Sequence, residues 1–309
     1  MAKNSIQFQA GLSLSQFFKR YGTETKCRRV LFKIKWPNGF SCPVCQHNKY
    51  FIIKRQYRYQ CQSCHHQTTA TVGTVLQSTK VPVQYWFYAA YLLTQSKNSI
   101  SAMSLKRMLG VDYKTAWRIK HKLVIAMQLS ENKQRLCGCI QVDDAYIGGK
   151  KRGGKRGRGA AKTPFVAAIS MVHNKPFNAK LTRVASFKQQ DMAAWGRQHC
   201  RPGSTVISDG MPGFRGLRQA ALLHTAIKTT GNQHAQDVVF RWVNTILGNV
   251  KRAIDGTYHA IRRPYIDRYL VLFQFRFNHR FDLKAMMDKT IRLFIKTAPI
   301  STKMLFAEL

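Results

Sequence analysis

Two aspartates stand out in this chain, because carboxylates are rare in it and because both follow apolar runs typical of strands. Only 13 Asp and Glu accompany 51 Lys and Arg. Asp143 ends the run 139–142, and Asp209 ends the run 204–208. A carboxylate at the end of a buried strand is held at a rigid edge, where it can face a metal ion. Either residue alone fits the start of a turn, so only the pair indicates a metal site.

Four of the eight cysteines have the spacing of a zinc ribbon, two Cys-x2-Cys pairs separated by fifteen residues. They are Cys42, Cys45, Cys61 and Cys64. Four thiolates complete a tetrahedron, so the nearby His47, His65 and His66 are substitutes that the ion does not need. Disulfide pairing is the alternative, and the lack of an export signal disfavours it. We therefore expect one structural Zn²⁺.

The net charge of +38 indicates that the protein binds a polyanion. A membrane surface is the competing partner, but no segment approaches the roughly 18 to 20 uninterrupted apolar residues of a spanning helix. The first residues also lack the apolar core of a signal peptide. We expect a soluble, cytoplasmic and nucleoid-associated protein that binds double-stranded DNA and no membrane.

Residues 101–120, between the cysteines and Asp143, have the pattern of a helix, a glycine-containing turn and a second helix. Leu105 and Leu109 form the apolar face of the first helix. The pattern is typical of a DNA-binding helix-turn-helix, although any helical hairpin with a glycine turn gives the same one. The cations available for phosphates or base edges are Lys114, Arg118 and Lys120.

From about residue 137 the pattern changes to strands, which indicates an α/β catalytic domain. Strand-like runs at 165–172 and 179–185 pair through a turn at 174–176, a helix fits 189–199, and a longer helix runs from about 237 to 254. This order is that of an RNase H-like mixed sheet with flanking helices. We predict three domains: residues 1–80 with the zinc ribbon, the helical region 81–133, and the catalytic domain 134–309 with its C-terminal helices.

Six segments, in order along the chain, resemble those of the zinc-ribbon insertion-sequence transposases of the ISXO type. They lie at 36–45, 73–75, 142–150, 208–210, 250–259 and 275–280. The resemblance implies a zinc ribbon followed by an RNase H-like DDE-type catalytic domain. It also implies an enzyme that acts as a homo-oligomer on DNA, cuts at element ends and joins 3′-hydroxyls to target DNA by direct transesterification.

The resemblance further implies the catalytic set, which is Asp143, Asp209, Asn244 and Lys251. Asn244 stands where such families usually carry Glu, although some branches look similar in carrying Asn. Mg²⁺, which Mn²⁺ can replace, would be held by the two aspartates and the amide oxygen of Asn244. Lys251, about two helical turns after Asn244, could contact a DNA phosphate, together with Arg252.

Three other acids compete for the role of third ligand. Asp237 is predicted to cap a helix and Asp255 to lie in a turn. Asp144 is expected on the opposite strand face from Asp143.

A run of cations between glycines follows the Asp143 strand and is well suited to contact the DNA backbone. Its members are Lys151, Arg152, Lys155, Arg156 and Arg158. A solvated linker is the simpler interpretation of the same run.

Two other functions remain open from the sequence. One is an inactive or domesticated regulator that keeps the ribbon and the helix-turn-helix without catalysis, which Asn244 favours and the two aspartates oppose. The other is an RNase H-like nuclease that only hydrolyses.

Overall fold

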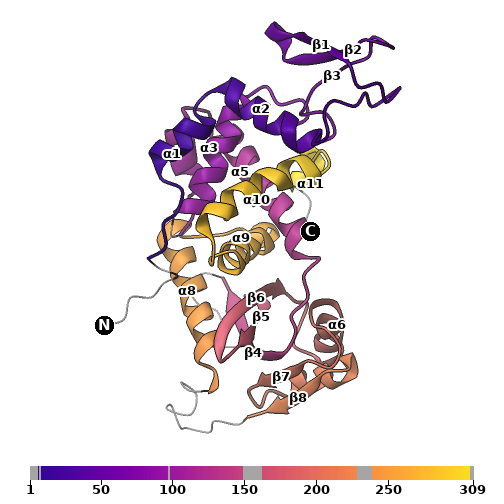
Figure 1. Cartoon of the computed structure of the whole chain (residues 1–309). Helices are drawn as coiled ribbons and strands as arrows, with labels where there is room; N and C mark the ends of the chain where they lie inside the picture. The colour runs from indigo at the N-terminus through magenta and orange to yellow at the C-terminus, as the bar shows by residue number, and fades with distance from the viewer. Residues whose placement is uncertain (1–5, 7, 97, 149–161, 228–238, 307–309) are drawn as a thin grey trace. The chain divides into compact units, whose positions relative to one another are not determined.

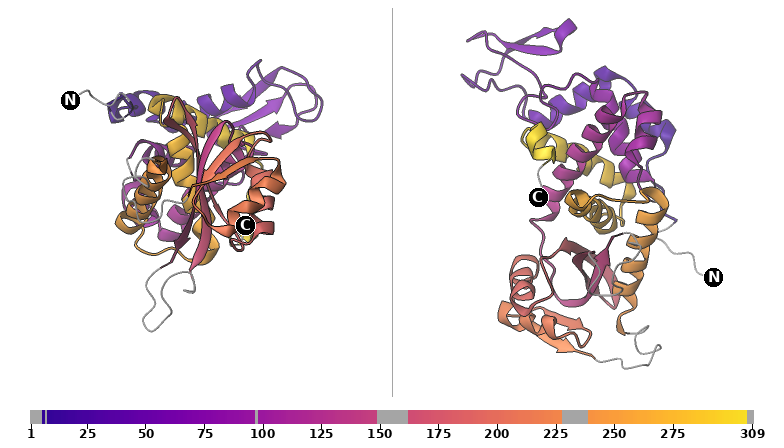
Figure 2. Two further views of the ribbon diagram at one scale, coloured as in Figure 1. Left: turned by 90° about the horizontal axis from the view of Figure 1, so that it is seen from below. Right: turned by 180° about the vertical axis from the view of Figure 1, so that it is seen from behind.

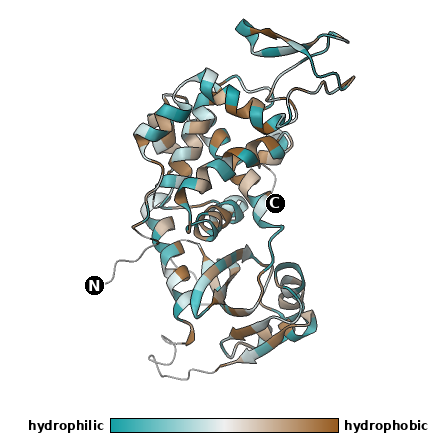
Figure 3. Cartoon of the chain, in the orientation of Figure 1, coloured by the Kyte–Doolittle hydropathy of each residue, from teal (hydrophilic) through white to brown (hydrophobic). Residues whose placement is uncertain are grey.

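The computed structural model describes residues 6, 8–96, 98–148, 162–227 and 239–306. They form two compact units, Met1–Ala126 with Phe281–Phe306, and Met127–Arg280, coloured along the chain in Figure 1. Hydrophobic and hydrophilic residues alternate along the helices (Figure 3). No helix of the described ranges is long and apolar enough to cross a membrane.

The first unit is built mainly of helices. They are α1 (Leu14–Tyr21), α2 (Glu24–Lys35), α3 (Val83–Gln95), α4 (Ala102–Leu109), α5 (Tyr113–Glu131, whose last residues belong to the second unit), α10 (Leu283–Lys296) and α11 (Thr302–Phe306). Helix α10 packs on α3 and α2, and Tyr21 donates a hydrogen bond to Asp288 of α10 (2.8 Å). The sequence analysis predicts that residues 281–309 belong to the catalytic domain. In the structure the apolar stripe of α10, including Met287 and Phe294, is buried in the first unit.

Helices α4 and α5 are joined by a short turn, as the sequence predicts for residues 101–120. Ser101 caps α4, which ends at Gly110 in the left-handed conformation (φ 65°). Asp112 then accepts a hydrogen bond from the backbone NH of Thr115 (3.1 Å) at the start of α5. The polar caps and the glycine therefore fix both ends of the turn.

The first unit also carries a small antiparallel sheet, β1 (Tyr50–Ile53), β2 (Arg58–Cys61) and β3 (Gln67–Thr68), in the order β1-β2-β3. Tyr59 packs against Phe32 and Trp36 of the α2 region, with ring centroids 4.9 and 5.5 Å apart. This aromatic contact attaches the sheet to α2.

The second unit contains a five-stranded sheet of order β6-β5-β4-β7-β8. The strands are β4 (Cys139–Ile147), β5 (Thr163–Val172), β6 (Lys175–Arg183), β7 (Thr205–Ser208) and β8 (Leu223–Ala226). Strands β4, β5 and β6 pair antiparallel, whereas β7 pairs parallel with both β4 and β8. The predicted RNase H-like mixed sheet is confirmed. Strand β8 was not predicted.

Helices cover both faces of this sheet (Figure 2). On one face Val142 and Val166 pack against α6 (Gln189–His199) and the 3-10 helix Pro212–Ala220. On the other, Ala145 and Ala167 pack against α8 (Arg241–Thr257) and α9 (Ile266–Asn278). Since neighbouring residues of β4 face opposite cores, the strand is packed on both faces and an acid in it is conspicuous.

Helix α9 closes the outer edge of the sheet. Three of its side chains accept the backbone NH groups of alternate residues of β6. The pairs are Asp267 with Arg183 (3.3 Å), Gln274 with Leu181 (2.9 Å) and Asn278 with Ala179 (2.7 Å). They satisfy an edge that would otherwise be open to pairing with another chain, which gives Asn278 of the segment 275–280 a structural role.

Candidate functional site

The parallel pairing of β4 with β7 brings Asp143 and Asp209 together. Gln141 lies opposite Ile207, so two residues further along each strand the two aspartates are at the same level. Strand β7 ends at Ser208, while β4 continues to Ile147 because β5 still pairs with it there. Asp143 therefore lies within its strand, not at the end as the sequence suggested, and beside the point where β7 stops.

Asp144 joins the two predicted aspartates. The carboxylate oxygens of Asp143, Asp144 and Asp209 lie within 4.8 Å of one another, and all three residues are half-buried. Asp143 accepts a hydrogen bond from the backbone NH of Asp144 (2.8 Å), which turns its carboxylate toward its neighbour. The alternation of strand faces was therefore not sufficient reason to exclude Asp144 from the cluster.

The pKa of Asp143 is raised to about 6. Burial is the largest cause, and the charges of Asp144 and Asp209 add to it, whereas the Asp144 NH and the charge of Lys251 lower the pKa. A divalent cation would relieve the repulsion among the carboxylates. Hard carboxylate oxygens are also the ligands that Mg²⁺ prefers, so this set of donors fits the ion.

A short chain of hydrogen bonds holds the loop that carries Asp209. The hydroxyl of Ser208 donates to the Asp209 carbonyl (2.9 Å) and lies 2.8 Å from Nε2 of the buried His224. The Asp209 carboxylate also accepts from the backbone NH of Met211 (3.0 Å). Asp209 thus starts a turn and belongs to the cluster at once, so its two interpretations from the sequence are compatible.

Helix α8 is attached to β4 by Gln141, a buried residue that the sequence analysis missed. Its amide nitrogen donates to the Val239 carbonyl (2.6 Å), and its amide oxygen accepts from the Val243 NH (3.2 Å). Gln141 and Asp143 are two residues apart, so they lie on the same face of β4, the one that packs against α8. A polar residue in an apolar strand, two positions before the aspartate, was the available signal.

Helix α8 carries the other predicted catalytic residues. Asn244 lies in its first turn and is exposed, as are Lys251 and Arg252. The charge of Lys251 lowers the pKa of Asp143, so this cation is close enough to act on the cluster. Asp255 is exposed within α8, not in a turn as predicted, and Asp237 lies outside the described residues.

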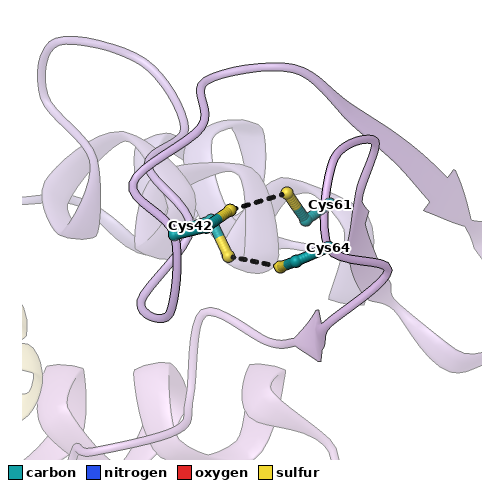
Figure 4. Close-up of side chains that lie close together, drawn as sticks. Cys42, Cys61 and Cys64 are labelled. Carbon is teal, nitrogen blue, oxygen red and sulfur yellow. Dashed lines mark hydrogen bonds between the residues drawn. The ribbon is translucent and has the colours of Figure 1, made fainter.

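The four predicted cysteines come together in the first unit, with Cys61 at the end of β2 and the other three in loops. The sulfur atoms of Cys42 and Cys64 are 3.6 Å apart, and those of Cys45 and Cys61 are 3.5 Å apart (Figure 4). Both distances are too long for a disulfide and close to the roughly 3.8 Å between thiolates of a tetrahedral zinc site. The cysteines therefore fit Zn²⁺, as predicted.

Backbone geometry supports the zinc site. Each cysteine pair is closed by a backbone hydrogen bond, from the Cys42 NH to His47 O (3.0 Å) and from the Cys61 NH to His66 O (2.9 Å). The pKa of Cys42 falls to about 6, chiefly because the backbone NH of Cys45 binds its thiolate. The pKa of Cys64 rises to about 12: the His66 NH lowers it, but the neighbouring thiols and burial outweigh this. Binding of a metal ion would displace the remaining thiol protons, because the ion binds thiolates.

The predicted DNA contacts differ in exposure. Lys114 and Arg118 are exposed on α5. Lys120 is only 1% exposed, and burial lowers its pKa to about 7. Its assignment as a DNA contact is therefore wrong, because the position falls on the packed side of α5 beside Ile119. The cations from Lys151 to Arg158 lie outside the described residues.

Comparison with known proteins identifies the class to which this fold and these sites belong. The ISXO2-like transposase domain matches residues 135–278, and the transposase zinc-ribbon domain matches residues 22–67. The chain therefore belongs to the zinc-ribbon insertion-sequence transposases with a DDE-type, RNase H-like domain.

One curated relative and two solved structures are similar to the chain. The relative is an uncharacterized protein in transposable element ISH50 of Halobacterium salinarum, 27% identical over 141 residues. The match covers 45% of this chain and 47% of the relative, so it spans about half of that protein's length. The structures are the Mos1 strand transfer complex and the Mos1 transposase paired-end complex with left transposon end. They are 12% and 11% identical, with TM-scores of 0.23 and 0.22, and the matches cover 66% and 72% of this chain and 79% and 82% of theirs.

Proposed function

We propose that this protein is an active DNA transposase that cleaves the ends of an insertion sequence and joins their 3′-hydroxyls to target DNA. The observation that carries the proposal is the cluster of Asp143, Asp144 and Asp209 carboxylates at the end of β7. Clustered carboxylates repel one another and destabilise the apo protein, unless a cation offsets their charge. Such a cluster in a transposase domain fits divalent-metal catalysis of phosphoryl transfer.

In this proposal Asp143, Asp209 and Asn244 hold Mg²⁺, or Mn²⁺ in its place. The bound ions would activate water or a 3′-hydroxyl and stabilise the leaving oxygen. Asn244 contributes a neutral amide oxygen, so the set carries less negative charge than one with a third carboxylate. Lys251, whose charge already acts on Asp143, contacts a phosphate oxygen and orients the strand to be attacked.

The partner is double-stranded DNA, both element ends and target, bound by a homo-oligomer of the chain. Lys114 and Arg118 of α5, Arg252 of α8 and the run from Lys151 to Arg158 contribute phosphate contacts. The net charge of +38 supports an association with the nucleoid.

The test is an assay with duplex oligonucleotides of the terminal repeats that flank the gene. Wild-type protein is expected to nick the repeats and join them to a second duplex when Mg²⁺ or Mn²⁺ is present, and to do neither in EDTA. Nicking without joining would indicate a nuclease. Specific binding without either reaction, under any metal, would indicate an inactive regulator, the outcome that the neutral Asn244 favours.

Salt dependence tests the run of cations. The affinity for non-specific duplex should fall steeply with salt, because each neutralised phosphate releases counterions. Replacing Lys151, Arg152, Lys155, Arg156 and Arg158 with Ala is expected to flatten the log–log slope by about 0.9 for each phosphate that is no longer neutralised. Fluorescence anisotropy over a salt series measures the slope. An unchanged slope would mean that the run is a solvated linker.

A further inference from the structure

The sheet of the zinc ribbon presents one face to solvent. Phe51 lies opposite Gln60, Gln60 opposite Gln67, and Ile53 opposite Arg58. Opposed residues point to the same side of a sheet, so these five side chains share a face, here called the outer face. Phe51 is 60% exposed, and Arg58 and Gln67 are exposed as well.

The other face of the same sheet carries Tyr50 and Tyr59, which are packed against neighbouring rings, and Ile52, which is 56% exposed. Tyr50 lies 4.8 Å from Phe40 and 5.8 Å from Phe32, measured between ring centroids, and Tyr59 packs against Phe32 and Trp36. These rings fix the sheet on α2. The outer face is therefore held rigidly, as a recognition surface requires.

The side chains of the outer face are those that recognise base edges. An Arg guanidinium pairs with O6 and N7 of guanine, a Gln amide pairs with N6 and N7 of adenine, and Phe contacts the methyl group of thymine. Nη1 of Arg58 donates to Oε1 of Gln67 (3.1 Å), so the two side chains lie next to each other. This bond uses one guanidinium nitrogen and leaves further donors on both groups.

Charge selects the partner. No Asp or Glu lies between Glu24 and Asp112, so the whole ribbon is free of carboxylates. Lys54 and Arg55, both exposed, form the tip of the β1–β2 hairpin, next to the outer face. A cationic tip beside a polar face with one large exposed aromatic residue fits a polyanion better than an apolar protein surface.

We infer that the outer face enters the major groove of duplex DNA and reads bases through Arg58, Gln60 and Gln67, while Lys54 and Arg55 contact flanking phosphates. The major groove admits a two-stranded β-ribbon, and the three reading residues lie on the paired strands β2 and β3. The inference rests on the proposed function, because it assumes that the protein binds DNA.

Selection from a random duplex pool by the zinc-loaded full chain provides the probe. Wild type is expected to enrich one sequence. Arg58→Ala should then weaken binding to the enriched duplex by about 5- to 150-fold, the cost of losing a bidentate base contact, and change binding to a scrambled duplex by less than about twofold. Gln60→Ala and Gln67→Ala should act in the same way at other bases. Lys54→Ala, the matched control, should weaken both duplexes equally.

A modified base locates the contact in the groove. Replacing a guanine of the enriched sequence with 7-deazaguanine removes N7 from the major groove, so at one position it should weaken wild type and leave Arg58→Ala unaffected. All variants should keep one zinc per chain, which shows that the ribbon is folded. Enrichment of no sequence, equal weakening of both duplexes by Arg58→Ala, or unchanged binding would each overturn the inference while leaving the strand-transfer test untouched. A chain that binds no duplex at all would overturn the proposed function as well.

Discussion

Asp143→Asn and Asp209→Asn are each expected to reduce end cleavage and strand transfer by about a thousandfold or more, with DNA affinity unchanged. Each substitution keeps the shape of the side chain and removes one charge from a cluster whose oxygens lie within 4.8 Å. A cluster with one negative charge fewer binds the divalent ion less tightly. A magnesium titration of strand transfer measures the effect, and anisotropy with the same duplexes measures binding. Transfer by either variant near the wild-type rate would contradict the assignment of that residue as a ligand.

Stability in EDTA separates loss of the site from loss of the fold. The pKa of Asp143 is about 6 in the folded protein, above its ordinary value of 3.8, so the folded state binds the proton more tightly than the unfolded chain does. Stability therefore decreases as the pH rises from about 4 to about 6, and the penalty persists above that range. At pH 7.5 the free energy of unfolding of Asp143→Asn, measured by denaturant titration, should exceed that of wild type by about 1–3 kcal/mol. This difference should vanish near pH 4.

Asn244 decides which version of the site is correct. If its amide oxygen binds the ion, Asn244→Ala should lose most strand transfer, while Asn244→Asp should retain it and require no more magnesium than wild type, because it adds charge at the same position of α8. Asp144→Asn is the informative companion, since Asp144 belongs to the same carboxylate cluster. Normal transfer by Asn244→Ala together with loss by Asp144→Asn would move the third ligand from the helix to the strand.

Local sequence patterns were sufficient to predict several elements of the catalytic domain. The predicted helix 189–199 coincides with α6, because its ends are marked by polar residues and its core face has helical spacing. The turn of the β5–β6 hairpin lies at His173 and Asn174, both with positive φ, one residue earlier than predicted. Strand β8 was missed because four residues with one buried side chain give too short a pattern to distinguish from a loop.

Contacts between distant residues were beyond the sequence patterns. Lys120 was predicted to contact DNA because the sequence gives its charge, whereas the structure is needed to show that it lies on the buried side of α5. Gln141 was passed over because its partners, Val239 and Val243, lie about 100 residues away along the chain. The packing of α10 on α3 likewise joins distant segments, since Gln95 and Leu283, which share a hydrogen bond, are 188 residues apart. Periodicity predicts that a helix has an apolar face, but it does not predict which element will cover that face.

Cys42→Ser and Cys64→Ser are each expected to lower the zinc content from one ion per chain to none and to unfold the ribbon, while the sheet of the second unit stays folded. The strands of the ribbon have only four, four and two residues, so they cannot hold their arrangement without the metal. A structural zinc contributes about 10–16 kcal/mol of folding free energy in small domains, far more than the aromatic contacts with α2.

Metal analysis and amide hydrogen exchange measure the two effects, with fast exchange expected in β1 and β2 and unchanged protection in β4 and β5. Cys137→Ser is the matched control, because Cys137 is exposed and lies outside the cluster of four cysteines, so this variant should keep its zinc. Loss of the ribbon removes the surface inferred to read base edges, whereas the remaining cations still attract phosphates. The two zinc-free variants should therefore bind enriched and scrambled duplexes with equal affinity. A fully reduced, zinc-free wild-type chain with a protected ribbon would contradict the zinc assignment.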